Sequence, residues 1–190
     1  VAPRIFNLDP PRHLKGSPQE EQLRLLDRLN REHLQQHPGE NDLEARMKSY
    51  GLAARMQVAA REAFDISRES EATKKMYGID QKVTRDYGTR CLIARRLVER
   101  GVRFVQILCN GQVWDHHGSI KTALPQRCVE VDKPAAALVR DLKERGLLDS
   151  TIVHWGGEMG RLPVIQFREG LTKRDKVGRD HNTYGCLLYT

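Results

Sequence analysis

The seven residues Val-Arg-Phe-Val-Gln-Ile-Leu at positions 102–108 lead, through Cys-Asn-Gly-Gln-Val, into Trp-Asp-His-His-Gly at 114–118. The first of these segments is short and dominated by β-branched and aromatic residues, which is typical of a buried β-strand. A second segment of this kind, Thr-Ile-Val-His-Trp at 151–155, leads into the glycine-rich loop 156–161. Between the two segments, apolar residues recur at helical spacing from about 126 to 145. This order predicts a βαβ unit whose two strands are parallel.

The first hundred residues predict a mainly helical part. Ser17 and Glu20 form a capping box with Pro18 at the first helical position, so a helix should begin there and end near His37. Further helices are expected over residues 41–63, 69–76 and 86–99. The fold class is therefore α/β, in one domain over residues 1–190 that is helical in 1–100 and holds the βαβ unit in 101–190. The sequence starts at Val1 and stops within an apolar run, so we expect the domain to be incomplete.

The loops that follow the two predicted strands hold the first candidate site residues. In open parallel sheets, ligands bind outside the carboxyl ends of the strands. Asp115, His116 and His117 follow the first strand and offer a mixed set of oxygen and imidazole donors that zinc, manganese or iron accepts. The alternative is that Asp115 caps the next helix and the two histidines face water.

Glu158 is the candidate in the second loop, where it lies between Gly157 and Gly160. Glycines at this position permit close approach of the backbone to a ligand, and a carboxylate beside a buried strand has to be paired, protonated or bound to a cation. The alternative to a metal is a simple salt bridge from Glu158 to Arg161.

Asp180 and His181 form a third candidate pair, because a ligating imidazole usually donates its second nitrogen to a carboxylate or a similar acceptor. A plain turn is the alternative. His154 lies within a predicted strand, where a histidine is more often a core residue than a ligand.

Composition argues against several classes of protein. The net charge is +7, but Arg and Glu alternate along the helical stretches, as on a solvated face, so we expect no nucleic-acid partner. No apolar run of about 18 residues is present, so we expect no membrane span. The four cysteines form no C-x-x-C pair and are expected to be buried.

Several stretches together resemble the bacterial DUF1501 family, which is abundant in planctomycetes and is grouped with the alkaline-phosphatase and sulfatase superfamily. The stretches that carry the resemblance are residues 91–105, 114–117, 141–148, 157–161 and 178–181. The resemblance implies a partial alkaline-phosphatase-like fold and a site for divalent metal ions, with zinc, manganese or calcium as the ion. Export to the periplasm or secretion is also implied by the resemblance alone.

The same resemblance implies roles for individual residues. Asp115, His117 and His181 would surround one metal ion, Glu158 would lie near a second, and Asp180 would be a ligand or would support one. Arg161, at the end of the Gly-Glu-Met-Gly-Arg stretch, is a possible catalytic residue.

Two departures from the family pattern are Met159 in place of phenylalanine and Leu162 in place of threonine, which we interpret as packing changes. A third is the absence of an amino-terminal half that would supply the nucleophile. We therefore expect a C-terminal fragment of a metal-dependent hydrolase of sulfate or phosphate esters, inactive as the isolated chain. Its substrate would be a small-molecule or polysaccharide ester.

Two other functions stay open at this point. One is a non-catalytic protein of the same fold that binds carbohydrate or a sulfated polymer, or has a structural role. The other is a basic nucleic-acid binder. An exposed sheet edge could also cause self-association.

Overall fold

The computed structural model describes residues 17–39, 41–109, 111–157, 160–166, 173 and 176–182, without the side chains of residues 17–20, 55–59 and 61. The described residues fall into two compact units, one that extends to Asp65 and one that begins at Ile66. No described helix is both long enough and apolar enough to cross a membrane. The assignment of residues 1–190 to a single domain stays a prediction.

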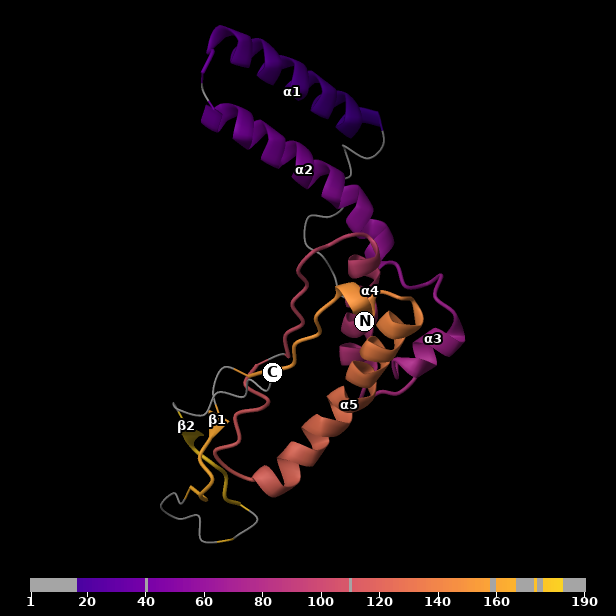
Figure 1. Ribbon diagram of the computed structural model, residues 1–190, viewed down its shortest axis with the longest axis vertical. Coiled ribbons are helices and arrows are strands. Elements are labelled where there is room, and N and C mark those ends of the chain that lie inside the picture. Colours follow the sequence, from indigo (N-terminus) through magenta and orange to yellow (C-terminus); the bar gives the residue numbers. More distant parts are fainter. Residues whose placement is uncertain are drawn as a thin grey trace. The chain divides into compact units, whose positions relative to one another are not determined.

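The first unit contains two helices joined by a short turn (Figure 1), α1 (Ser17–Gln36) and α2 (Asn41–Phe64). Both helices were expected within one residue of these bounds. The turn contains Gly39 at a φ of +92°, a conformation that glycine adopts without steric cost. Exposed ion pairs four residues apart, such as Arg31 with Asp27, lie along the helices, as the charge alternation predicts.

The second unit contains three further α-helices, and all of them were expected: α3 (Glu71–Met76), α4 (Arg85–Glu99) and α5 (Ile120–Glu144). A short 3-10 helix, η2 (Leu148–Ser150), follows them. Helix α5 begins six residues earlier than the sequence indicates. Its first turn is stabilised by a distant segment, because the N–H groups of Ser119 and Ile120 donate to the carbonyls of Lys176 and Val177 at 3.1 Å each.

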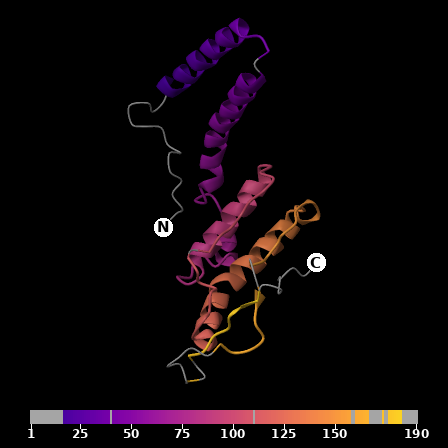
Figure 2. The ribbon, with the colours of Figure 1, turned by 90° about the vertical axis from the view of Figure 1, so that its left-hand side faces the viewer.

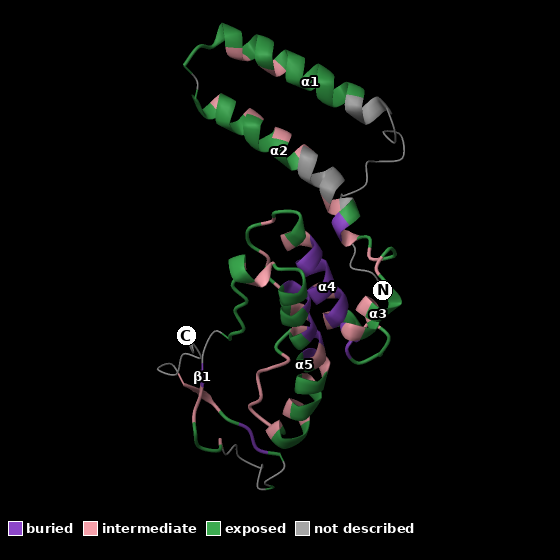
Figure 3. Cartoon of the chain, turned by 45° about the vertical axis from the view of Figure 1, so that its right-hand side comes forward, coloured by how far each residue is buried: buried purple, intermediate pink, exposed green. Residues whose placement is uncertain are grey.

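The core of this unit lies where α4 packs against α5 (Figure 2). Its buried apolar side chains are Tyr77, Cys91, Leu92 and Ala137. Helix α4 is buried along most of its length, in contrast to α1 (Figure 3). Of the described cysteines only Cys91 is buried, so the expectation for Cys109 and Cys128 was wrong.

A buried ion-pair network joins α4 to α5. The guanidinium of Arg95 is 2% exposed and pairs with Glu69 at 2.8 Å, with Glu99 at 2.6 Å and with Asp141 at 2.9 Å. Burial opposes the charge of Arg95, but hydrogen bonds to Glu69 and Glu99 outweigh it and raise the pKa of Arg95. Asp141 also accepts a 2.9 Å hydrogen bond from the hydroxyl of Tyr77, so the network is tied to the apolar core.

The described residues do not contain the predicted parallel βαβ unit. Residues 102–109 and 151–157 lack regular strand structure, although α5 does lie between them in the chain. A strand needs a hydrogen-bonded neighbour, and among the described residues neither segment has one. Large apolar side chains on both segments are exposed, with Phe104 at 82% and Ile152 at 96%.

The sheet that does form is small and antiparallel. It consists of β1 (Gly160–Arg161) and β2 (His181–Asn182), with Gly160 opposite Asn182 and Arg161 opposite His181. The described part of the chain is therefore a mixed, mainly helical fold in which only this short pairing is β-structure of more than one residue.

Candidate metal centre

Residues 176–182 form the segment that organises the site, because it pairs with the chain on two sides. On one side it meets the loop before α5, where the N–H of Arg179 donates to the carbonyl of His116 at 3.0 Å. On the other side it meets residues 160–166, where the N–H groups of Leu162 and Gln166 donate to the carbonyls of Asp180 and Gly178 at 2.9 Å each. Three stretches that are distant in the sequence are thereby held next to one another.

Gly178 permits the close approach of two of these stretches. A Cβ atom built on Gly178 would lie 2.2 Å from the carbonyl oxygen of His116, 2.3 Å from the carbonyl carbon of His117 and 2.5 Å from the nitrogen of Gly118. These are backbone atoms, which cannot move aside as the end of a flexible side chain does. Only glycine therefore fits at position 178.

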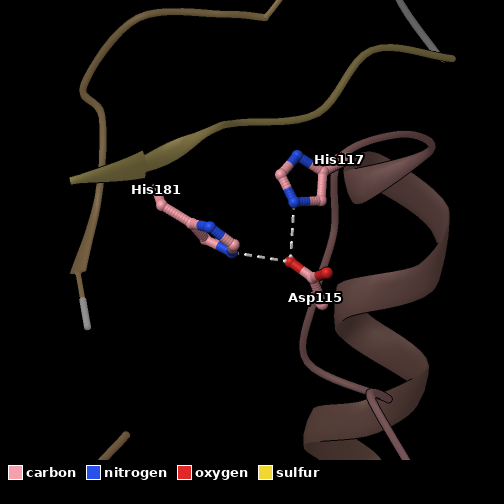
Figure 4. A group of neighbouring side chains, drawn as sticks. All are labelled: Asp115, His117 and His181. Carbon is pink, nitrogen blue, oxygen red and sulfur yellow. Dashed lines mark hydrogen bonds and ion pairs between the residues drawn. The ribbon is translucent and has the colours of Figure 1, made fainter. Parts of the chain in front are cut away.

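Asp115, His117 and His181 meet at a single point (Figure 4). Nε2 of His117 and Nε2 of His181 each lie 3.0 Å from Oδ1 of Asp115. The two imidazole rings are edge-on to each other, with their centroids 4.7 Å apart. All three side chains are half-buried. The structure thus brings together the three residues that the family resemblance implies around one metal ion, although their role as ligands stays a prediction.

The geometry of these donors fits a divalent ion. One ligand atom from each residue lies within 4.8 Å of the others. Bonds of about 2.0–2.2 Å in a tetrahedral site place ligand atoms roughly 3.3–3.6 Å apart, so the observed 3.0 Å between oxygen and nitrogen has to widen by only a few tenths of an ångström. Two imidazoles and one carboxylate would also leave a coordination position open, as in catalytic rather than structural sites.

Gln166 is a residue of this site that the sequence did not reveal. Its Oε1 lies 2.9 Å from Nδ1 of His117, so an N–H at Nδ1 can donate to it and leave the lone pair of Nε2 available for a metal ion. The carboxylate of Asp180 is more distant from the same nitrogen, at 3.7 Å, and accepts a 2.8 Å hydrogen bond from the backbone N–H of His181. Asp180 therefore supports the loop, and Gln166 orients the imidazole.

Arg161 also contacts the site. Its Nη2 donates to Oδ1 of Asp115 at 2.5 Å, and its Nη1 donates to the carbonyl of Arg179 at 3.2 Å. Arg161 and His181 are directly opposite each other in the antiparallel pair, so their side chains project from the same face of the sheet. The hydrogen bond from Arg161 lowers the pKa of the Asp115 carboxyl, and the hydrogen bond from His181 acts in the same direction.

His116 is not one of the three residues that meet at this point. Its Nε2 is buried and has no hydrogen-bond partner among the described residues. Burial lowers the pKa of His116, and the charges of Arg161 and Arg127 lower it further. A neutral imidazole is thus favoured at this position.

Glu158 lies outside the described residues, and so does Met159. His154 is exposed, so its assignment to the core was wrong, because the strand that would have buried it does not form.

A cavity of about 280 Å³ adjoins the site through Trp114, the residue before Asp115. Its lining side chains are mainly aromatic and charged, and they include Tyr87, Arg90, Trp114, Arg127 and Glu130. The two arginines are already paired, Arg90 with Asp86 and Arg127 with Glu130. The cavity therefore suits an uncharged group more than an anion.

Comparison with known proteins identifies the family of the chain. A family model described as "Protein of unknown function (DUF1501)" matches residues 2–189. No curated protein and no solved structure matches the chain significantly. Because the family model covers nearly all of the sequence, the chain belongs to the DUF1501 family.

Proposed function

We propose that this chain holds a divalent metal ion through Asp115, His117 and His181 and serves in the hydrolysis of sulfate or phosphate esters. The observation that carries the proposal is the convergence on one point of these three side chains, which come from the loop before α5 and from β2, with Asp115 and His181 66 residues apart. The relationship to the alkaline-phosphatase and sulfatase superfamily, with its fold and export from the cytoplasm, is part of the same proposal.

The residues of the chain have distinct roles in this proposal. The two imidazoles and the Asp115 carboxylate hold the ion, and Gln166 keeps His117 in the required orientation. Two nitrogen donors favour zinc over calcium, which prefers oxygen ligands, and the carboxylate also allows manganese. When bound, the ion would polarise the ester oxygen and activate the attacking group.

The cavity beside Trp114 is suited to the part of the substrate that does not react. Its aromatic walls, Tyr87 and Trp114, provide surfaces for a ring, and its volume of about 280 Å³ is close to the lower end of common ligand pockets. A small-molecule ester or one unit of a polysaccharide is therefore the substrate class that we propose.

A second candidate function is binding without catalysis, of a carbohydrate or a sulfated polymer. It is favoured by one observation: among the described residues, no hydrogen bond joins a serine, threonine or cysteine to Asp115, His117 or His181. The attacking group would have to be water or a residue that the structure does not describe. For this reason we expect this chain alone to turn over esters no faster than the free metal ion does.

Titration of inorganic sulfate and phosphate into the zinc- or manganese-loaded chain tests the proposal. We expect anion binding that requires the metal ion and is lost in His181→Ala, but is kept in His154→Ala, an exposed histidine outside the group. Metal-independent binding of a sulfated polysaccharide that is equal in both variants would support the second candidate instead. Turnover of p-nitrophenyl sulfate or phosphate well above the rate of the free ion would contradict the expected inactivity of this chain.

A further inference from the structure

Three nitrogen atoms meet at the same oxygen atom of Asp115. Oδ1 accepts the 2.5 Å hydrogen bond from Nη2 of Arg161, and the Nε2 atoms of His117 and His181 lie 3.0 Å from it. A carboxylate oxygen has two lone pairs, and the hydrogen bond from Arg161 engages one of them at the atom that both imidazoles face. Arg161 therefore competes with a cation for this oxygen.

Electrostatic repulsion adds to the competition between Arg161 and a metal ion for Oδ1 of Asp115. A guanidinium is always protonated, and a divalent cation at Oδ1 would lie within a few ångströms of it, inside a half-buried site where screening is weaker than in water. Repulsion between the two cations opposes their binding at the same oxygen. An ion bound at Oδ1 would therefore favour a move of Arg161 away from this atom.

Arg161 has contacts that would keep it near the site after such a move. Its Nη1 donates to the carbonyl of Arg179 at 3.2 Å, and its Nη2 lies 3.4 Å from the carbonyl of Trp114. Its side chain is 25% exposed, so the guanidinium can turn toward solvent. A guanidinium that has lost its carboxylate partner is well suited to bind a sulfate or phosphate group through paired hydrogen bonds.

We propose that Arg161 takes the place of the metal ion on Asp115 in the metal-free chain and, when an ion displaces it, binds the anionic group of the substrate. This inference rests on the proposed function, because it requires both a metal ion and an anionic ester. It assigns to Arg161 an action that depends on metal loading. If Arg161 instead supports the ligating carboxylate, removing its charge should weaken metal binding rather than strengthen it.

The test is a calorimetric titration of zinc and of manganese into the unchanged chain, Arg161→Gln, Arg161→Lys and Arg179→Gln. The last variant removes the same charge from an exposed side chain of the neighbouring segment and controls for general electrostatics. We expect Arg161→Gln to bind the ion about 10-fold more tightly, within the range that is usual for coupled sites. Arg161→Lys should lie in between, and Arg179→Gln should match the unchanged chain. Circular dichroism and urea unfolding establish that each variant is folded.

Adding inorganic sulfate tests the second half of the inference. Sulfate should strengthen metal binding severalfold in the unchanged chain and clearly less in Arg161→Gln, because linkage between two ligands is reciprocal and only the variant lacks the guanidinium. A sulfate effect of equal size in both proteins would overturn the anion-binding role. Equal or weaker metal binding by Arg161→Gln, with clear binding by the unchanged chain, would overturn the competition while leaving the proposed function in place. If no protein binds the ion, both proposals fail.

Discussion

Replacing Gly178 by alanine should break the docking of the segment that carries His181. The added Cβ atom would start 2.2 Å from the carbonyl oxygen of His116, so the segment has to retreat by about 1 Å to reach ordinary van der Waals contact. Three backbone hydrogen bonds hold this junction, and the loss of about 1 kcal/mol for each gives a cost of about 3 kcal/mol. Metal affinity should fall roughly 100-fold, because binding has to restore the docked arrangement first.

Gly118→Ala is the matched control for this prediction. Gly118 lies at the same junction, where it forms a β-bridge with Val177, but a Cβ atom there would be 3.4 Å from its nearest neighbour, the carbonyl of Lys176. We expect its zinc affinity, measured by calorimetry, to stay within a few-fold of the unchanged chain. Equal affinities of Gly178→Ala and Gly118→Ala would refute the reasoning that close packing at position 178 assembles the site.

Three further predictions concern the ion-pair network and the orientation of the ligands. Arg95→Met should lower the free energy of urea unfolding by about 3–5 kcal/mol, because the buried carboxylate of Asp141 loses a close partner. Burial raises the pKa of the Glu69 carboxyl, but hydrogen bonds from Arg96 and Arg95 outweigh it and lower the pKa in the folded chain. The stability that Glu69 contributes is therefore complete above the pKa of the unfolded chain, about 4.3. It is lost as the pH falls through the lower pKa of the folded chain. Glu69→Gln should accordingly be less stable than the unchanged chain at pH 7. Urea unfolding curves should show that it loses less stability than the unchanged chain between pH 5 and pH 3. An equal loss in both proteins would contradict this. Gln166→Leu should weaken zinc binding about 10- to 100-fold, with unchanged unfolding, because His117 loses the acceptor that orients it.

The helices could be predicted from the sequence because their signals are local. The capping box at Ser17, the helical spacing of apolar residues and the stop at Gly101 all act within a few residues of where they stand. The beginning of α5 was missed because hydrogen bonds from its first N–H groups to the carbonyls of Lys176 and Val177, more than fifty residues away, extend it.

The strands were misjudged for a related reason. Residues 102–108 and 151–155 have the composition of buried strands, but a strand is completed only by a hydrogen-bonded neighbour, which their own sequence cannot supply. The short strands that pair Arg161 with His181, by contrast, lack the alternation of apolar and polar residues that predicts a strand.

At the candidate site, the residue types pointed to the cluster Asp115, His116 and His117 and to the pair Asp180 and His181. The family resemblance implied the set Asp115, His117 and His181, but only the fold brings these three together. The same is true of Gln166, since a single glutamine in a loop gives no signal until its contact with His117 is known. Arg161 was singled out by the family resemblance, as the last residue of the Gly-Glu-Met-Gly-Arg stretch. Its contact with Oδ1 of Asp115, on which the further inference depends, required the structure.

The most direct test of the central claim is elemental analysis combined with calorimetric titration of zinc and manganese. The unchanged chain is compared with a variant that carries Asp115→Ala, His117→Ala and His181→Ala together. We expect about one ion per chain, bound by the unchanged protein and lost in the variant, while both remain folded. Equal binding by the two proteins, or binding by neither, would contradict the claim that these three side chains form a metal site.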